Sequence, residues 1–204
     1  MSEERDEIFA RVRRALAPLP VRTALPDWDP ARIAPGFAAA DSCTLFVERF
    51  REVGGVPLSS RQGLMAWLAG KGWACGYCDP GLWPELRGHF PPQMEVSTSL
   101  RRARIDDYAF AITVASGAIA ETGTVILTDR DTPVRLAALA PWAHVAVIPR
   151  SRIHRSIACA LGAMPDDPNI VWVTGPSKTA DIEGILIEGV HGPGIQAAWV
   201  ADDR

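Results

Sequence analysis

Lysine is almost absent from this chain: of its 21 basic residues only two, Lys71 and Lys178, are lysines, and the rest are arginines. The net charge is -3 and the sequence pI is about 5.8. Proteins that bind nucleic acid usually present a basic face with aromatic side chains among the cations. The arginines here are scattered along a slightly acidic chain, so the sequence predicts no nucleic-acid partner.

Long apolar runs are also missing. No stretch reaches the roughly 20 apolar residues that cross a bilayer without Ser, Thr, Glu or Gly interrupting it. The first residues, Met1 to Asp6, are acidic, whereas signal and transit peptides are basic or acid-poor. We therefore expect no membrane-spanning segment and a cytoplasmic location.

Cysteine is scarce, and two of the four cysteines form the motif Cys75-Gly76-Tyr77-Cys78. A redox motif of this kind needs a helix after its first cysteine, and the following Asp-Pro-Gly blocks one. A zinc site needs further ligands, and only His89 lies nearby. We predict no metal site and interpret the thiols as buried small apolar residues, with a redox or metal role for the pair as the alternative. The four cysteines are Cys43, Cys75, Cys78 and Cys159.

A proline-rich stretch divides the chain. Residues 3–16 have apolar side chains on one face and predict a helix, and five prolines between Pro18 and Gly36 predict an extended linker. The remaining length, with 48% hydrophobic residues overall, is enough for one α/β domain with its own core. We predict an N-terminal helix plus linker over 1–40 and an α/β domain over 41–204.

From Asp41 onward, helical and strand-like patterns alternate. Asp41 or Ser42 caps a helix that stops at Gly54, and a β-α-β round follows over 56–75. The apolar runs 109–115 and 124–128 are joined by a short link, which predicts an antiparallel pair. Ser151 is predicted to cap a later helix. The expected fold is a three-layer αβα domain with a mixed, mostly parallel sheet.

The end of the chain is interpreted as a strand, a helix and a second strand. An apolar run covers 170–174, apolar positions at helical spacing run from Ile182 to Val190, and another apolar run covers 195–200. This pattern predicts a right-handed βαβ unit whose strands are parallel.

The turn before that helix is a candidate anion site, because the first N–H groups of a helix are unpaired and attract negative charge. Lys178 is one of the two lysines, and the hydroxyls of Ser177 and Thr179 flank it. The alternative is that Ser177 caps the helix and Lys178 is solvated. The stretch is not a Walker P-loop, since the first glycine of that motif is missing. The predicted site for a small carboxylate or phosphate comprises Thr122, Gly175, Ser177, Lys178, Thr179 and Asp181.

Two further residues are candidates at or near this site. Glu121 lies between two apolar runs and either caps backbone N–H groups or acts as a catalytic base or nucleophile facing the anion site. His191 either caps the end of the predicted helix or is functional. A helix from Lys178 to His191 would separate the two by about 20 Å, which excludes a shared site within one chain. Glu183 satisfies the helix dipole or belongs to the site.

Three blocks of sequence, at 118–124, 174–183 and 189–193, resemble in order and spacing the LUD-domain family and its lactate-utilisation protein C group. The resemblance covers about 41–200 and implies a fold similar to the NagB/RpiA/CoA-transferase-like class. It also implies an accessory role in bacterial oxidation of L-lactate to pyruvate, beside two partner proteins that carry iron–sulfur clusters. This chain lacks the ferredoxin-like cysteine run of longer family members, so we expect it to bind no cofactor. The resemblance assigns no catalytic residue, and leaves Glu183 and His191 as possible partner contacts.

Three functions therefore compete. The first is the accessory subunit of a lactate-oxidising iron–sulfur system. The second is a stand-alone enzyme of the CoA-transferase or sugar-phosphate isomerase type that binds an anionic small molecule. The third is a redox or metal protein that uses Cys75 and Cys78.

Overall fold

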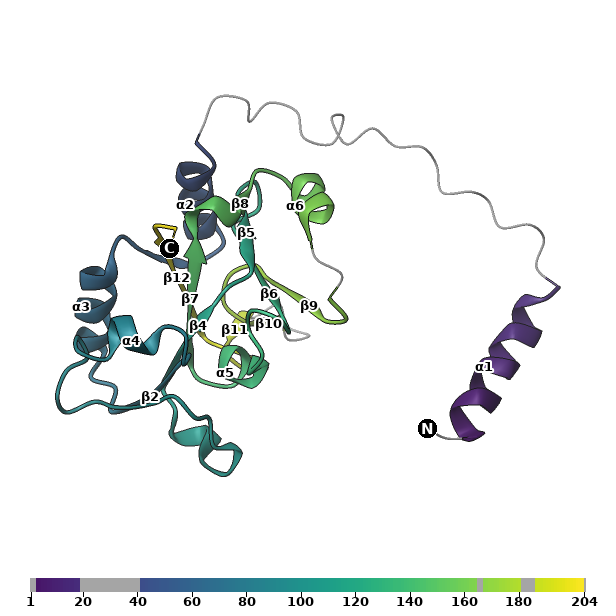
Figure 1. Ribbon diagram of the computed structural model, residues 1–204, viewed down its shortest axis with the longest axis horizontal. Helices are drawn as coiled ribbons and strands as arrows, with labels where there is room; N and C mark the ends of the chain where they lie inside the picture. Colours follow the sequence, from purple (N-terminus) through teal and green to yellow (C-terminus); the bar gives the residue numbers. More distant parts are fainter. Residues whose placement is uncertain (1–2, 19–40, 165–166, 181–185, 204) are drawn as a thin grey trace. The chain divides into compact units, whose positions relative to one another are not determined.

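The computed structural model describes residues 3–18, 41–164, 167–180 and 186–203. The chain divides into two compact units, Met1–Ile33 and Ala34–Arg204. Helix α1 (Glu3–Leu16) lies in the first unit, has the predicted bounds, and has arginines in its last turn. Its apolar side chains Ile8, Phe9, Val12 and Leu16 are all exposed. All other described helices and strands belong to the second unit (Figure 1).

The centre of the second unit is a six-stranded sheet, here called the main sheet, in which every neighbouring pair of strands is parallel. The longest pairing joins two inner strands, β7 (Ala143–Pro149) and β12 (Ile195–Ala201), over seven residues. Apart from His144 and Gln196, which are buried and pair with each other in the register, both strands are apolar, as expected for strands covered on both faces. In spatial order the strands are β1 (Val56–Leu58), β12 (Ile195–Ala201), β7 (Ala143–Pro149), β4 (Phe110–Val114), β2 (Cys75–Cys78) and β3 (Glu95–Ser97).

A second, four-stranded sheet corrects one prediction. Residues 109–115 and 124–128 do not pair: β4 belongs to the main sheet, and β6 (Thr124–Thr128) belongs to the second sheet. The short link between them contains a strand of its own, β5 (Gly117–Ile119), and this strand pairs antiparallel with β6. The sheet is completed by β8 (Ile153–His154) and β9 (Ile170–Val173).

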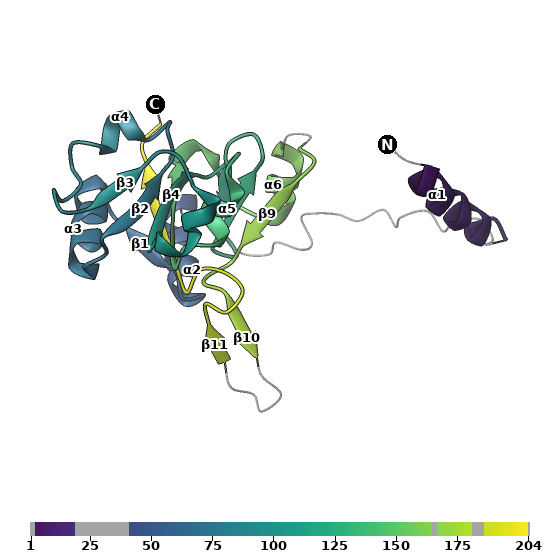
Figure 2. The ribbon, with the colours of Figure 1, turned by 90° about the horizontal axis from the view of Figure 1, so that it is seen from below.

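The predicted βαβ unit at the end of the chain is wrong. Strand β9 lies in the second sheet and β12 in the main sheet, so the two are not parallel neighbours. Between them, β10 (Lys178–Ala180) and β11 (Leu186–Glu188) form an antiparallel hairpin instead of a helix. The apolar spacing around Ile187 fits a strand as well as a helix, and Ile187 itself is β-branched, which favours a strand. Figure 2 shows this hairpin extending away from the main sheet.

Helices cover the sheets, and three of those that the structure describes begin at side-chain caps. As predicted, Asp41 caps α2 (Ser42–Glu52). Ser60 caps α3 (Arg61–Lys71) in the same way, by accepting a hydrogen bond from a backbone N–H group. Ser151 does not cap a helix, because it lies in a short 3-10 helix, η3 (Arg150–Arg152), and Ser156 caps the following α6 (Ile157–Ala163). The remaining helical segments are α4 (Trp83–Leu86), η2 (Arg102–Asp107) and α5 (Arg135–Leu139).

The buried core confirms a three-layer α/β arrangement. On one face of the main sheet, Leu64 and Leu68 of α3 pack with Leu86 of α4 against the sheet. On the other face, Phe46 and Phe50 of α2 lie among apolar residues of both sheets, so α2 joins the two. Helix α6 covers the far side of the second sheet through Ala160. The main sheet therefore has α3 and α4 on one face and the second sheet on the other, and its carboxyl edge lies between these two layers.

The cysteines lie in different layers of this fold. Cys78 is buried in the core cluster that includes Leu64, whereas Cys75 packs with Tyr77 in a separate cluster. Residues three apart on a strand point to opposite faces, so the two thiols lie on opposite sides of the main sheet. Cys159 is exposed on α6, and Cys43 and Cys75 are half-buried, so the prediction that the cysteines are buried is correct for Cys78 alone.

Candidate functional site

Glu121 lies in the turn between β5 and β6, and its carboxylate faces α6. Its Oε1 atom accepts a hydrogen bond of 2.6 Å from the N–H group of Ile157, the first residue of that helix. A carboxylate at this position also offsets the positive end of the helix dipole. Of the two roles that the sequence allowed, this contact favours the cap.

Thr122 connects the two sequence blocks at 118–124 and 174–183. Its hydroxyl is 2.7 Å from that of Thr124, which is 2.8 Å from the hydroxyl of Thr174. Gly175 follows at once and has a positive φ of 75°, and a Cβ at this position would lie 2.2 Å from the carbonyl oxygen of Val53. The structure thus brings Thr122 and Gly175 together against the end of α2, in a closely packed joint.

Ser177 and Lys178 have different neighbours. The N–H group of Ser177 donates to the carbonyl of Pro193, and its own carbonyl accepts from Gly189. The ammonium of Lys178 is 3.6 Å from the carboxylate of Glu188 on the paired strand. The helix terminus on which the anion site was predicted is therefore replaced by a strand, and Lys178 has a carboxylate partner.

The hairpin also changes the position of His191. Its strands bring residues 177 and 189 into direct hydrogen-bonding contact, so the separation of about 20 Å expected from a helix is wrong. Gly192, next to His191, lies close enough to Ser177 that a Cβ there would be 3.2 Å from the Cβ of Ser177. His191 itself is exposed, Thr179 pairs with Ile187, and the predicted residues Asp181 and Glu183 lie outside the described residues.

The carboxyl edge of the main sheet holds a cavity of about 270 Å³ that the sequence reasoning missed. We call it the edge cavity. Its apolar walls come from the ends of β4, β7 and β12 and from the residue before α4, and its polar rim comes from the residues that follow β7 and β12. It is lined by Leu82, Val114, Val147, Pro149, Ser151, Arg152, Ala201, Asp202 and Asp203.

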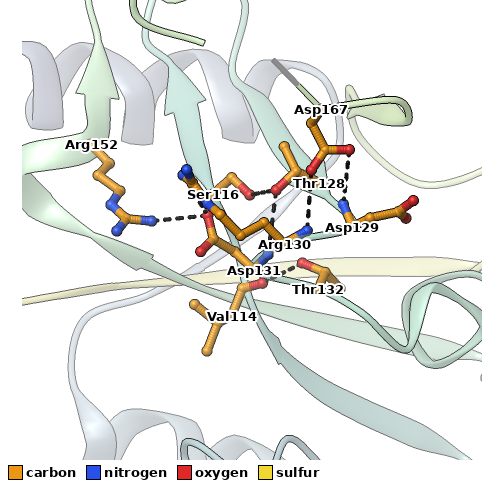
Figure 3. A network of polar contacts seen from close by, with 9 residues as sticks. All are labelled: Val114, Ser116, Thr128, Asp129, Arg130, Asp131, Thr132, Arg152 and Asp167. Carbon is orange, nitrogen blue, oxygen red and sulfur yellow. Dashed lines mark hydrogen bonds and ion pairs between the residues drawn. The ribbon is translucent and has the colours of Figure 1, made fainter. Parts of the chain in front are cut away.

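A polar network fixes the rim of the edge cavity (Figure 3). Arg152 Nη1 donates to the carboxylate of Asp131 over 3.1 Å, and the hydroxyl of Thr132 donates to the carbonyl of Val114 over 2.6 Å. The hydroxyls of Ser116 and Thr128 are 2.6 Å apart. These contacts tie the end of β4 to the loop after β6, so both sheets hold Arg152 in place.

Two carboxylates near this edge accept backbone hydrogen bonds. The N–H group of Ser151 donates to Asp203 over 2.9 Å, and this bond lowers the pKa of that carboxyl below its ordinary value. The N–H group of Asn169 likewise lowers the pKa of Asp167, which also accepts from Arg130. Both groups are therefore charged at neutral pH and bind the loops that border the edge.

A second cavity, of about 390 Å³, lies beside the first and opens over the start of α3. We call it the α3 cavity. Asp202, at the end of β12, lines both cavities. The sequence did contain a signal for this region, because polar residues directly follow three apolar strands, and ligands bind at the carboxyl ends of parallel strands. The α3 cavity is lined by Ser59, Ser60, Arg61, Gln62, Glu85, Arg150, Trp199, Val200 and Asp202.

The cysteine motif has the chemistry of a structural pair. Burial raises the pKa of the Cys78 thiol to about 12, with a smaller contribution from Asp79, and burial also raises the pKa of Cys75. Both thiols stay protonated at neutral pH, and a protonated thiol is a poor nucleophile and a poor metal ligand. Among the described residues, no three His, Cys, Asp or Glu side chains are placed to hold a metal ion together.

Comparison with known proteins identifies the class. The LUD domain matches residues 84–196, which run from α4 into β12 and include the second sheet, and the chain belongs to the LUD domain family. A crystal structure of a DUF162 family protein from Deinococcus radiodurans has the same fold, with a TM-score of 0.59 and 23% identity. That likeness covers 81% of this chain and 100% of the other.

Sequence relatives carry a common name. Lactate utilization protein C of Macrococcus caseolyticus is 34% identical over 135 residues, which are 62% of this chain and 54% of that protein. The protein of the same name from Bacillus licheniformis is 33% identical over 109 residues, 50% of this chain and 45% of the other. The protein of this name from Geobacillus kaustophilus is 30% identical over 143 residues, which are 63% of this chain and 60% of that protein. The chain thus spans about half the length of these relatives. In the parts of the chain that the structure describes, no helix is long and apolar enough to cross a membrane.

Proposed function

We propose that this chain is an accessory subunit of a bacterial L-lactate utilisation system, in which lactate is oxidised to pyruvate together with two iron–sulfur partner proteins. The observation that carries the proposal is the match to several proteins named lactate utilization protein C, at 30–34% identity over 109–143 residues. The LUD domain match over 84–196 contains the three sequence blocks that resemble the family.

In this proposal the electron-transferring clusters belong to the partner proteins. A cluster needs several thiolates that converge on one point. Cys75 and Cys78 lie on opposite faces of the main sheet with raised pKa values, which supports placing the clusters elsewhere. Glu121 serves as a helix cap, which supports a role other than catalysis for that residue.

Growth tests the role in lactate utilisation. Deleting the encoding gene should abolish growth with L-lactate as the carbon source and leave growth on pyruvate unchanged, because pyruvate enters after the proposed step. A plasmid copy of the gene should restore growth on lactate. Equal growth of the deletion strain and its parent on L-lactate would contradict the proposal.

Isolation of the complex tests the partners. An affinity-tagged copy, purified from lactate-grown cells, should elute with two further proteins, and the eluate should contain iron and acid-labile sulfide. The untagged strain is the control. If the isolated chain instead turns over an acyl-CoA or a sugar phosphate, it is a stand-alone enzyme of the alternative class.

A further inference from the structure

The edge cavity and the α3 cavity adjoin at the end of β12, where Asp202 lines both. Each of these volumes, about 270 and 390 Å³, is comparable with the lower part of the range of about 300–1,000 Å³ found for small-molecule sites. The position also suits a ligand, since open parallel sheets bind ligands at the carboxyl ends of their strands. None of the described residues of the predicted anion site lines either cavity.

The α3 cavity is rich in donors for an anionic group. Arg61 and Arg150 are among the residues that line it, and the guanidinium of Arg150 is only loosely paired, 4.0 Å from Asp41. Ser60 accepts from the N–H group of Gly63, which leaves its hydroxyl hydrogen available to donate. The N–H groups of Arg61 and Gln62, in the first turn of an 11-residue helix, have no intrahelical acceptor. A phosphate group matches this set of donors.

The edge cavity has a different chemistry. Leu82, Val114, Val147 and Ala201 form walls that suit a flat or apolar group rather than an anion. Two charged residues of its rim are already engaged, since Arg152 pairs with Asp131 and Asp203 accepts from Ser151, whereas Asp202 lies at the border with the α3 cavity. The part of a ligand that enters here is therefore uncharged.

Asp202 lies where the two cavities adjoin, and a carboxylate beyond the end of a parallel strand is well suited to accept hydrogen bonds from sugar hydroxyls. We propose that the two cavities form one binding site for a nucleoside monophosphate. The phosphate lies over the start of α3 beside Arg61 and Arg150, the ribose hydroxyls donate to Asp202, and the base fills the edge cavity. This site goes beyond the proposed role in lactate utilisation and does not depend on it.

Calorimetric titration of the purified full chain tests the ligand class. AMP and UMP are the complete probes, adenosine lacks the phosphate, and ribose 5-phosphate lacks the base. We expect at least one nucleotide to bind about tenfold or more tightly than adenosine, ribose 5-phosphate and inorganic phosphate, because it alone occupies both cavities. Failure of both nucleotides to bind, or binding no tighter than inorganic phosphate, would overturn the proposal.

Substitution of Gln62, which is exposed, separates the site from the fold. Gln62→Glu places a negative charge in the first turn of α3, where it favours the helix dipole but repels a phosphate. The variant should melt at the same or a higher temperature and bind the nucleotide about tenfold more weakly, with adenosine unaffected. Gln93→Glu makes the same change at an exposed position that lines neither cavity, and should bind like the wild type.

The Asp202→Asn variant tests the proposed contact between Asp202 and the ribose. It should weaken the nucleotide and adenosine by similar factors, because both carry the ribose. Nucleotide binding that is unchanged in both Gln62→Glu and Asp202→Asn would place the nucleotide elsewhere and refute this site. The assay uses the isolated chain, so its outcome is independent of whether the gene is needed for growth on lactate.

Discussion

His144 lies in the middle of the main sheet, and both of its ring nitrogens are hydrogen-bonded. Gln196 Oε1 is 3.0 Å from Nδ1, and an amide oxygen only accepts, so Nδ1 carries the proton and Nε2 accepts from the hydroxyl of Thr113 at 2.9 Å. Complete burial lowers the pKa of His144 from 6.5 to about 4, partly offset by the bond to Gln196. These contacts indicate a structural role for His144.

This lowered pKa predicts a loss of stability in mild acid. Below pH 6.5 the unfolded chain binds a proton on His144 that the folded chain does not bind until about pH 4. The contribution of His144 to the free energy of unfolding should therefore be at its maximum above pH 6.5, and it should fall by about 3 kcal/mol as the pH drops to about 4. Urea unfolding at a series of pH values measures this slope.

The matched control is His144→Gln, which removes the titrating ring. It should be less stable than the wild type at pH 7 but show a flatter pH dependence between 6.5 and 4. Burial also lowers the pKa of His154, so a smaller slope should remain in the variant. An unchanged slope in His144→Gln would assign the acid sensitivity to other groups.

The cysteine pair leads to a prediction of little effect. Cys75 and Cys78 belong to separate core clusters, and burial raises both pKa values. Replacing both by Ser should leave growth on lactate intact and cost about 1–2 kcal/mol of stability, mostly from the hydroxyl buried at Cys78. Zinc bound in a 1:1 ratio by the wild type and absent from the double variant would show that the pair is a metal site.

At the scale of elements, Glu121 joins the second sheet to α6. Glu121→Ala should lower the free energy of unfolding by about 1 kcal/mol, because the N–H group of Ile157 loses its acceptor. Glu121→Gln keeps an oxygen acceptor and should cost less. Urea unfolding compares the two variants. If Glu121→Gln were as stable as the wild type yet failed to support growth on lactate, the carboxylate would have a chemical role.

Gly175 marks the joint between β9 and the end of α2. An added Cβ would meet the carbonyl oxygen of Val53 at 2.2 Å, and φ is positive, so Gly175→Ala should cost on the order of 2–4 kcal/mol. Gly70→Ala is the control, because Gly70 lies within α3 with open space around it, and it should gain about 0.5–1 kcal/mol. Thermal unfolding of the two variants should therefore shift in opposite directions.

At the scale of the whole molecule, the division at residue 40 remains a prediction from the prolines. Limited proteolysis should cleave the chain between Pro18 and Gly36 and leave a folded fragment that begins near Asp41. That fragment should melt cooperatively at nearly the temperature of the full chain. Resistance to cleavage in this range, or loss of cooperative melting in a chain that starts at Asp41, would show that the N-terminal helix is integral to the domain.

Much of the architecture could be predicted from local chemistry. The caps at Asp41 and Ser60, the strand at 56–58 and the buried central strand β7 depend on side-chain patterns within a few residues, so the sequence indicates them directly. The alternation of such helices and strands along the sequence was enough to predict a three-layer α/β fold. The family followed from three sequence blocks whose order and spacing are specific even where their structural roles are not.

The assignment of strands to sheets was decided only by the tertiary structure. An apolar run such as 124–128 contains no information about which of two sheets it joins, and the intervening β5 is too short to show a pattern of its own. The hairpin of β10 and β11 was predicted as a helix for a related reason, since its apolar spacing satisfies both periods. Long-range pairing, which depends on the whole core, resolved these ambiguities.

The position of the candidate site also depends on which strands pair in the tertiary structure. Sequence alone placed Lys178 at a helix N-terminus and Glu121 opposite it, whereas the structure pairs Lys178 with Glu188 and directs Glu121 to α6. The two cavities arise where residues from three strands, β4, β7 and β12, meet α3 and the segment before it, and Asp202 joins the cavities only because β12 lies between β1 and β7. Residue types and caps follow from the sequence, but a cavity is formed by segments far apart in the chain, and only their packing brings them together.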